Sequence, residues 1–204
     1  MRRGLLIRAA TGALLLGVAG VSGAAPSANV TRAAEAFLYI QSARGTHYLH
    51  VTALSGLEGT DASTAHVRVE VARCTAAACV DGVTYAADVP MRVVTVADDF
   101  SSAVTSFTFA GRPLTVRWSR SAQTPRAHGE VLGGGSAADF SALTTVGYTA
   151  DARVQLGSLA CAADDAIVGA GVDAANPSRT SGYAAFPRQL PAGLQGRLTC
   201  GQRP

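Results

Sequence analysis

Apolar residues occupy every second position along several short stretches of the chain. In the clearest stretch, residues 66–73, three valines alternate with polar side chains. A period of two residues is typical of a strand with one buried face and one solvated face, as antiparallel sheets have. We therefore predict a strand here, with the valines in a core. The face expected to lie in water carries His66, Arg68 and Glu70.

A second alternating pattern lies on both sides of the Ala-Gly-Arg-Pro break at 110–113. The apolar positions are Phe107 and Phe109 before the break and Leu114, Val116 and Trp118 after it. Alternation on both sides of a short glycine-containing break predicts a β-hairpin.

Weaker strand patterns recur along the chain, separated by Gly, Pro, Asp and Ser. They cover residues 35–41, 48–54, 80–87, 91–97, 142–149, 152–160, 165–172 and 194–200. Helix signals are poor, because the capping-box pattern at 31–35 runs directly into β-favouring residues. About ten short strands at this spacing predict an all-β protein. We expect an antiparallel β-sandwich, immunoglobulin-like or related, held by disulfides.

No period is visible between residues 119 and 139, a segment with three consecutive glycines at 133–135. Such a stretch is unusual inside a compact domain and is typical of a functional loop or a linker. We favour a single β-sandwich domain over 33–204 with a long loop at 119–139. The alternative is a linker between two small β modules, 33–118 and 140–204.

The N-terminus has the pattern of a secretory signal peptide. Three arginines within the first eight residues precede an apolar run over 9–21, and Ser22 and Ala24 supply small residues before a cleavage site. We predict a signal peptide over 1–24, a linker over 25–32, and a secreted or cell-wall-associated product. A retained membrane anchor is the alternative, but the run is shorter than the ~20 residues that span a bilayer.

The chain has 204 residues, with 17 basic and 14 acidic side chains, and every basic residue is arginine. Together with abundant Ala and Gly, this composition indicates a high-GC bacterial genome. The absence of lysine excludes Schiff-base chemistry and a P-loop lysine. Three of the 17 arginines lie in the predicted signal peptide, which leaves 14 against 14 acids in the mature chain. With no basic run either, we expect no nucleic-acid partner.

Four cysteines, Cys74, Cys79, Cys161 and Cys200, follow the signal peptide. An even number in an exported chain predicts two disulfides. The short Cys74–Cys79 spacing favours that pair, and therefore Cys161–Cys200 as the second. A zinc site is the alternative, but neither pair has Cys-x2-Cys spacing.

The sequence Cys74-Thr-Ala-Ala-Ala-Cys79 followed by Val80-Asp81-Gly82 resembles the short cysteine loop of the neocarzinostatin-type apoproteins. Those are small exported β-sandwich proteins with two disulfides. The resemblance covers nine residues, and the other cysteine pair here is much wider. The enediyne-binding role of that family is therefore not carried over to this chain.

Catalytic patterns are weak. Ser136 follows two glycines as in a nucleophile elbow, but the strand before it and the helix after it are missing. His47 and His50 fall in a predicted strand, where they point to opposite faces and do not share an ion, so we expect exposed structural histidines. Ten Asp and four Glu allow many carboxylate pairs, whose separations decide whether a hydrolase is present.

Calcium is the one cofactor for which the sequence contains candidate ligands. Carboxylates at loop ends can bind this hard cation, although no EF-hand pattern is present. The candidates are Asp164, Asp165 and Asp173, with Asp98 and Asp99 at another loop. Turn-forming, solubilising Asp is the alternative interpretation.

A binding surface is predicted around the single tryptophan, Trp118, with Arg120, Arg126 and His128 near it in sequence. An exposed tryptophan beside arginines can bind a glycan, a carboxylate or a partner protein. The alternative is that Trp118 continues the alternation of its strand and is buried.

Taken together, these patterns favour an exported, non-catalytic extracellular or cell-wall protein that binds a ligand or partner or has a structural role. The alternatives are a secreted hydrolase that uses paired carboxylates and an enzyme inhibitor that presents 119–139.

Overall fold

The computed structural model describes residues 30–55, 64–132, 141–173 and 184–204. The predicted signal peptide, most of the predicted linker, and Ser136 lie outside these residues. The strands are β1 (Val30–Ser42), β2 (Gly45–Ser55), β3 (Thr64–Cys74), β4 (Cys79–Pro90), β5 (Val94–Val96), β6 (Ser102–Phe109), β7 (Arg112–Leu132), β8 (Ser141–Leu156), β9 (Leu159–Ala162), β10 (Asp165–Asp173) and β11 (Thr199–Cys200). Two short 3₁₀ turns complete the described elements, η1 (Met91–Val93) and η3 (Ala192–Leu194).

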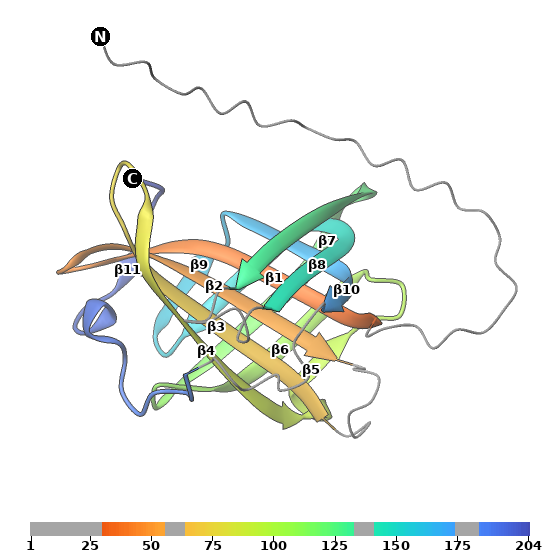
Figure 1. Ribbon diagram of the computed structural model, residues 1–204, viewed down its shortest axis with the longest axis horizontal. Coiled ribbons are helices and arrows are strands. Elements are labelled where there is room, and N and C mark those ends of the chain that lie inside the picture. Colours follow the sequence, from red (N-terminus) through yellow and green to blue (C-terminus); the bar gives the residue numbers. More distant parts are fainter. Residues whose placement is uncertain (1–29, 56–63, 133–140, 174–183) are drawn as a thin grey trace, which may run out of the picture.

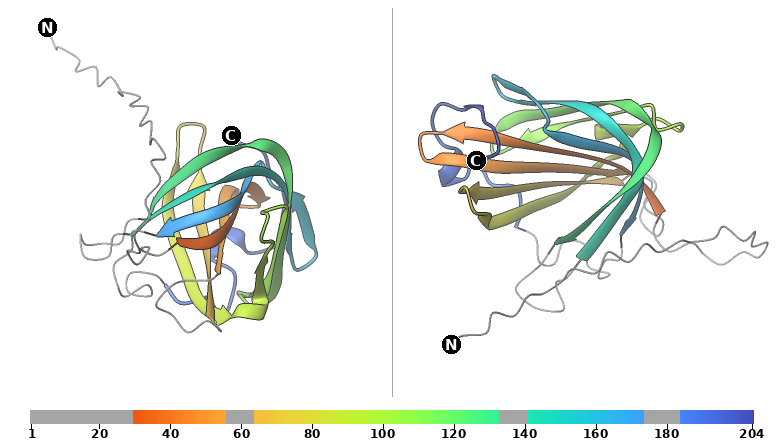
Figure 2. Two further views of the ribbon diagram at one scale, coloured as in Figure 1. Left: turned by 90° about the vertical axis from the view of Figure 1, so that its right-hand side faces the viewer. Right: turned by 90° about the horizontal axis from the view of Figure 1, so that it is seen from above.

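The strands form a single antiparallel sheet that curls into a half-barrel (Figures 1 and 2). Its order is β4-β3-β2-β1-β10-β8-β7-β6-β5, with β11 added to β1 and β9 to β8. The two edge strands, β4 and β5, are consecutive in the chain and are joined by η1. The all-β prediction is confirmed. The sandwich is not confirmed, because the described strands build one curled sheet rather than two stacked ones.

Alternation along each strand decides which side chains fill the interior of the half-barrel. On β1 the interior residues are Ala34, Ala36, Leu38 and Ile40, and β2 and β3 contribute alternate residues in the same way. Phe109, Leu114 and Leu156 pack against them from the other half of the sheet. Many interior side chains are alanine and valine, which occupy little volume and so allow a tight curl.

The predicted hairpin around 110–113 is confirmed, since β6 pairs with β7 from Phe109 and Arg112 outward. Its turn residues Ala110 and Gly111 both have positive φ angles, 53° and 72°. Positive φ at both central residues is the geometry of the two-residue turn that matches the twist of a hairpin.

The expected loop over 119–139 is wrong for residues 119–132, which continue β7 and pair with β8. Residues 133–140 lie outside the described chain. The register breaks between Arg120 and Pro125, where five steps along β7 face only two along β8. This irregularity explains why no period of two is visible there.

Other predicted strands differ in extent. Residues 142–149 and 152–160 belong mainly to the one long strand β8, and within 91–97 only Val94–Val96 is a strand. Within 194–200 only Thr199–Cys200 pairs. Segments from both predicted modules share the sheet, because β1 pairs with β10, and the division into domains stays a prediction.

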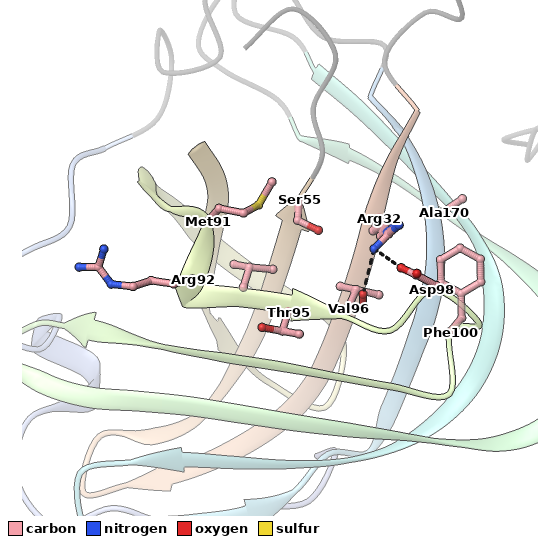
Figure 3. A pocket seen from close by; sticks show the side chains of 10 residues that line it. Arg32, Ser55, Met91, Arg92, Thr95, Val96, Asp98, Phe100 and Ala170 are labelled. Carbon is pink, nitrogen blue, oxygen red and sulfur yellow. Dashed lines mark hydrogen bonds and ion pairs between the residues drawn. The ribbon is translucent and has the colours of Figure 1, made fainter. Parts of the chain in front are cut away.

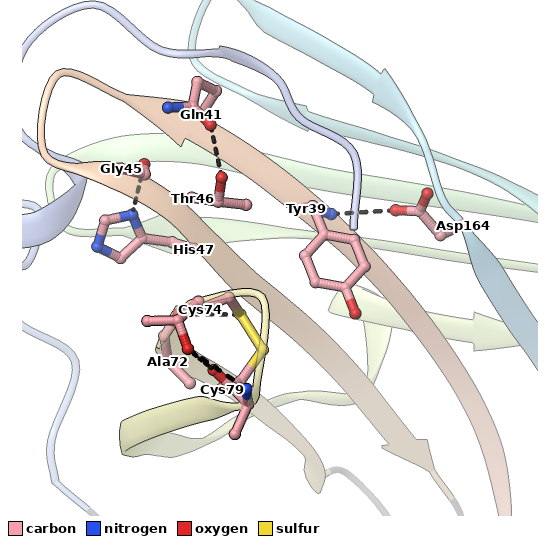
Figure 4. The surroundings of a disulfide bond; sticks show 11 residues. Tyr39, Gln41, Gly45, Thr46, His47, Ala72, Cys74, Cys79 and Asp164 are labelled. Atoms are coloured by element: carbon pink, nitrogen blue, oxygen red, sulfur yellow. Dashed lines mark hydrogen bonds between the residues drawn. A yellow bond between two sulfur atoms is a disulfide. The ribbon is translucent and has the colours of Figure 1, made fainter. Parts of the chain in front are cut away.

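Both predicted disulfides are present. Cys74–Cys79 closes the turn between β3 and β4 (Figure 4), and Cys161–Cys200 joins β9 to β11. The zinc alternative for these cysteines is therefore excluded, since none is free. Two disulfides are compatible with an extracellular location. Across the described residues, no helix has the length and hydrophobicity to cross a bilayer.

Two glycines allow a sharp bend in the sheet. Gly147 of β8 lies opposite Gly169 of β10. A Cβ atom on Gly147 would lie 2.2 Å from the carbonyl oxygen of Val168, and one on Gly169 would lie 2.4 Å from the Cα of Gly147. Only glycine allows this approach. Beyond the bend, β7 and β8 reach the outer face of β1, where the His128 ring lies 4.8 Å from that of Phe37.

Candidate ligand-binding site

A buried polar cluster lies on the outer face of the sheet, under the bend. Glu35 of β1 is 0% exposed, and its Oε2 lies 3.1 Å from Nε2 of His50 on β2. Its Oε1 accepts a hydrogen bond from the Thr145 hydroxyl of β8. Nε2 of His128 on β7 lies 3.8 Å from the same Oε2. The cluster therefore joins β1 and β2 to the part of the sheet that bends over them.

The pKa of the Glu35 carboxyl group is lowered despite its burial. Burial by itself raises the pKa of Glu35, but three neighbours act in the opposite direction. His50 lowers the pKa by a hydrogen bond and by its charge, Thr145 by a hydrogen bond, and His128 by its charge. The net result is a pKa below the ordinary value of a glutamate.

His50 lies between two carboxylates. Its Nε2 faces Glu35, and its Nδ1 lies 3.8 Å from Oε2 of Glu70. The Thr52 hydroxyl is 3.1 Å from Nε2, and the Phe37 ring stacks on the imidazole at 4.2 Å. The hydrolase alternative rests on paired carboxylates, and here Glu35 and Glu70 lie on either side of one imidazole. However, His50 is only 2% exposed, so a substrate cannot approach its contact with Glu35.

The expectation of a water-facing polar side on β3 is wrong for His66 and Arg68, both of which are buried. His66 is compensated by Asp88 on β4, with Nδ1 2.9 Å from Oδ1. Alternation separates two faces of a strand, but it does not say whether the polar face is covered.

The histidine prediction holds in one part and fails in another. His47 and His50 point to opposite faces of β2, as expected for residues three apart in a strand. Neither is exposed, and His47 is also buried, at 4%.

The predicted binding group around Trp118 does not come together on one surface. Trp118 is 2% exposed and lies in the core, where its Nε1 donates a 2.8 Å hydrogen bond to the carbonyl of Glu35. Arg120 lies over the Tyr148 ring, 4.8 Å from its centroid. His128 lies against Phe37, and Arg126 forms an ion pair. The alternative that buries Trp118 is therefore the one found.

The predicted calcium ligands have separate partners. Asp165 is the acid that pairs with Arg126, and Oδ2 of Asp164 accepts a 3.0 Å hydrogen bond from the Tyr39 amide. Asp173 ends β10 at another part of the sheet. Among the described residues, no three His, Cys, Asp or Glu side chains gather closely enough to hold a metal. Calcium binding stays a prediction.

A cavity of 840 Å³ opens at the end of the half-barrel where β1 begins and β2 ends (Figure 3). One wall is a row across three paired strands, Ser55 of β2, Arg32 of β1 and Ala170 of β10. The facing wall comes from η1, β5 and the turn after β5. Its residues are Met91, Arg92, Val94, Thr95, Val96, Asp98 and Phe100. We call this space the mouth cavity.

Arg32 crosses the mouth cavity from β1 to the opposite wall. Its Nη1 lies 2.6 Å from Oδ1 of Asp98 and 3.4 Å from the carbonyl oxygen of Val96 (Figure 3). This bridge ties the free edge strand β5 to the middle of the sheet. It also holds a guanidinium group beside the apolar side chains of Val96 and Phe100.

The lining combines apolar walls with a small excess of positive charge. Among the described residues, two arginines and one acid line the cavity, Arg32, Arg92 and Asp98, and the Arg92 side chain points away from the other two (Figure 3). In the part of the chain that the structure describes, the Arg92 guanidinium has no acidic partner. Ser55 is 5% exposed and directs its hydroxyl toward the cavity, without a hydrogen bond to any described residue (Figure 3). Apolar walls with a few polar groups are typical of small-molecule sites, whose volumes run from roughly 300 to 1,000 Å³.

Sequence reasoning missed this site. Ser55 lies outside every motif, and Arg32 falls in the capping-box pattern at 31–35 and in a segment expected to be a linker. The only available signal was alternation, because Arg32 continues the interior positions of β1 two residues before Ala34. No family model, curated protein or solved structure matches this chain.

Proposed function

We propose that this protein is an exported, non-catalytic ligand-binding protein of the extracellular space or cell wall. Its ligand would be a small molecule with an apolar body and one acidic group, bound in the mouth cavity. The signal-peptide pattern and the two disulfides support export. The observation that carries the binding role is the 840 Å³ cavity with apolar walls and two arginines.

Different residues of the cavity would bind the apolar and the acidic parts of the ligand. The aliphatic or aromatic body of the ligand would pack against Met91, Val96 and Phe100, where burial of apolar area supplies most of the affinity. The acid would pair with Arg32, which Asp98 already orients. The Ser55 hydroxyl would donate a further hydrogen bond.

A non-catalytic role is supported by the burial of the acid/base cluster of Glu35 and His50. Glu35 and His50 are enclosed, so neither is available to a substrate. Among the described residues, the mouth cavity is lined by one carboxylate, Asp98, and that group is engaged by Arg32. Hydrolysis by paired carboxylates needs two such groups on either side of a substrate.

The experiment is a displacement assay on the secreted chain, with 8-anilinonaphthalene-1-sulfonate as the bound probe. Decanoate is expected to displace the probe about tenfold better than decanol, and decylamine worse than either. A tenfold difference in affinity corresponds to about 1.4 kcal/mol of binding free energy, which a single modest charge contact can supply. The variant Arg32→Gln should remove the preference for decanoate. Arg153→Gln, an exposed arginine on β8, is the control and should change nothing. Equal displacement by acid and amine would contradict the proposal.

A further inference from the structure

A second cavity, of 340 Å³, lies at the other end of β2, next to the Cys74–Cys79 turn. Its walls come from the β1–β2 turn, the end of β3, the start of β4 and the segment around η3. The chemistry-bearing residues are Arg44, His47, Arg73, Asp81 and Tyr85. We call this space the hairpin cavity. No described residue lines both cavities, so binding in the hairpin cavity is independent of the proposed function of the mouth cavity.

His47 brings a hydrogen-bond acceptor to the hairpin cavity. Its Nδ1 lies 3.2 Å from the carbonyl oxygen of Gly45, and a carbonyl only accepts, so Nδ1 carries the hydrogen (Figure 4). In the tautomer with its hydrogen on Nδ1, the ring presents a lone pair at Nε2. That atom has no hydrogen-bond partner in the described chain, although the side chain is 96% buried.

The backbone at Gly193 packs closely against this nitrogen. A Cβ atom at position 193 would lie 2.2 Å from Nε2 of His47. Any other residue at this position would therefore displace the imidazole. With glycine at 193, Nε2 lies on the cavity wall. An acceptor there can be satisfied by a hydrogen-bond donor on a bound ligand.

Two arginines supply the charge. Nη2 of Arg73 lies 3.1 Å from Oδ2 of Asp81, so this guanidinium is already oriented by an acid. The Arg44 guanidinium has no acidic partner among the residues that the structure describes. Two arginines against one aspartate leave an excess positive charge beside the neutral acceptor.

We propose that the hairpin cavity binds a compact oxyanion that carries one proton, with monohydrogen phosphate as the clearest case. Arg44 and Arg73 donate to the charged oxygens. The phosphate hydroxyl donates to Nε2 of His47. Inorganic phosphate and the phosphate group of an ester share this chemistry in part, but an ester loses its last proton near pH 6, so it lacks the donor at higher pH.

The test is calorimetric titration of the full chain at about pH 8 with inorganic phosphate, sulfate and methyl phosphate. Sulfate has nearly the same shape and charge as monohydrogen phosphate but carries no proton. Phosphate is expected to bind one to one, at least about tenfold more tightly than sulfate or methyl phosphate, since a lone pair facing an unprotonated oxygen is penalised. The variant Arg44→Gln, in an exposed turn, should weaken phosphate about tenfold, and Arg153→Gln should not.

A second variant isolates the acceptor. His47→Phe keeps a ring in the same place and is expected to remove the preference for phosphate over sulfate. If this buried substitution unfolds the chain, the ¹⁵N shift of Nε2 replaces it, since that shift should move on addition of phosphate and not of sulfate. Equal affinity for phosphate and sulfate in the unmodified chain would overturn the proposal. Undiminished phosphate binding by Arg44→Gln, or no binding at about 10 mM phosphate, would do the same.

Discussion

The indole nitrogen of Trp118 donates a 2.8 Å hydrogen bond to the backbone carbonyl of Glu35. These residues are 83 positions apart, on β7 and β1, which are not neighbours in the sheet. The bond therefore spans the interior of the half-barrel. On the outer face of β1, the side chain of the same Glu35 joins the sheet to the part that bends over it. One residue thus links both faces of the sheet to distant strands.

Replacement of Trp118 tests the inner link. Trp118→Phe removes the donor and part of the buried ring, and we expect a loss of about 2 kcal/mol in the free energy of unfolding. Urea unfolding followed by circular dichroism measures it, because the variant has no tryptophan left to report fluorescence. A loss below about 0.5 kcal/mol would mean that the bond across the interior is unimportant.

Replacement of Glu35 tests the outer link through pH. Because the pKa of Glu35 is lower in the folded chain than in the unfolded chain, its ionised form stabilises the fold above the unfolded pKa. That contribution is lost as the pH falls through the folded pKa. Glu35→Gln should lower the free energy of unfolding by about 3–5 kcal/mol near neutral pH, as removal of one partner from a buried pair does.

The same variant should flatten the acid limb of the stability profile, since a glutamine has no proton to gain. Asp151→Asn, which removes an exposed carboxylate on β8, is the matched control and should cost less than about 0.5 kcal/mol. An acid limb of unchanged slope in Glu35→Gln would show that other carboxyl groups control acid unfolding.

The bend at Gly147 and Gly169 predicts a contrast between two glycines in neighbouring strands. Gly147→Ala places a methyl group against backbone atoms at 2.2 Å and should destabilise the fold by about 1–3 kcal/mol or more. At Gly129 of β7 the nearest atom to a Cβ is the Thr144 hydroxyl, at 3.9 Å, so Gly129→Ala should be nearly neutral. Thermal unfolding of both variants checks this, and equal melting temperatures would contradict the bend.

The two disulfides should contribute unequally. Cys161–Cys200 spans 39 positions and Cys74–Cys79 only 5, so loop entropy gives about 4 kcal/mol for the first and about 2 kcal/mol for the second. Paired Cys→Ser variants, compared by urea unfolding, measure the difference. A larger loss from the Cys74–Cys79 pair would show that the small turn has a role beyond shortening the unfolded chain.

Much of the fold could be predicted from the sequence, because alternation depends only on short-range geometry. Most of the strands, the hairpin around Gly111 and both cysteine pairs follow from spacing alone, but the second half of β7 does not. The arrangement of the strands in a single curled sheet does not, since one buried face fits a curled sheet as well as a stacked one. The bend depends on two glycines, Gly147 and Gly169, that meet only after β8 and β10 pair.

The site was harder to predict, for a related reason. Arg32, Ser55 and Ala170 lie side by side only because β10, β1 and β2 pair in one register. In sequence these three residues are far apart and share no motif. Trp118, which its chemistry favours as a binding residue, instead packs in the core. His50 and Glu35 lie in a buried polar cluster.

The most direct test of the binding role is to fill the mouth cavity without changing its charge. Ala170→Leu adds three carbon atoms between Arg32 and the facing wall, and Ala160→Leu makes the same change at an exposed position on β9. Calorimetry with decanoate should give one site in the unmodified chain and in Ala160→Leu, and at least tenfold weaker binding in Ala170→Leu. Undiminished binding by Ala170→Leu, or no binding by the unmodified chain, would contradict the assignment of this cavity as the ligand site.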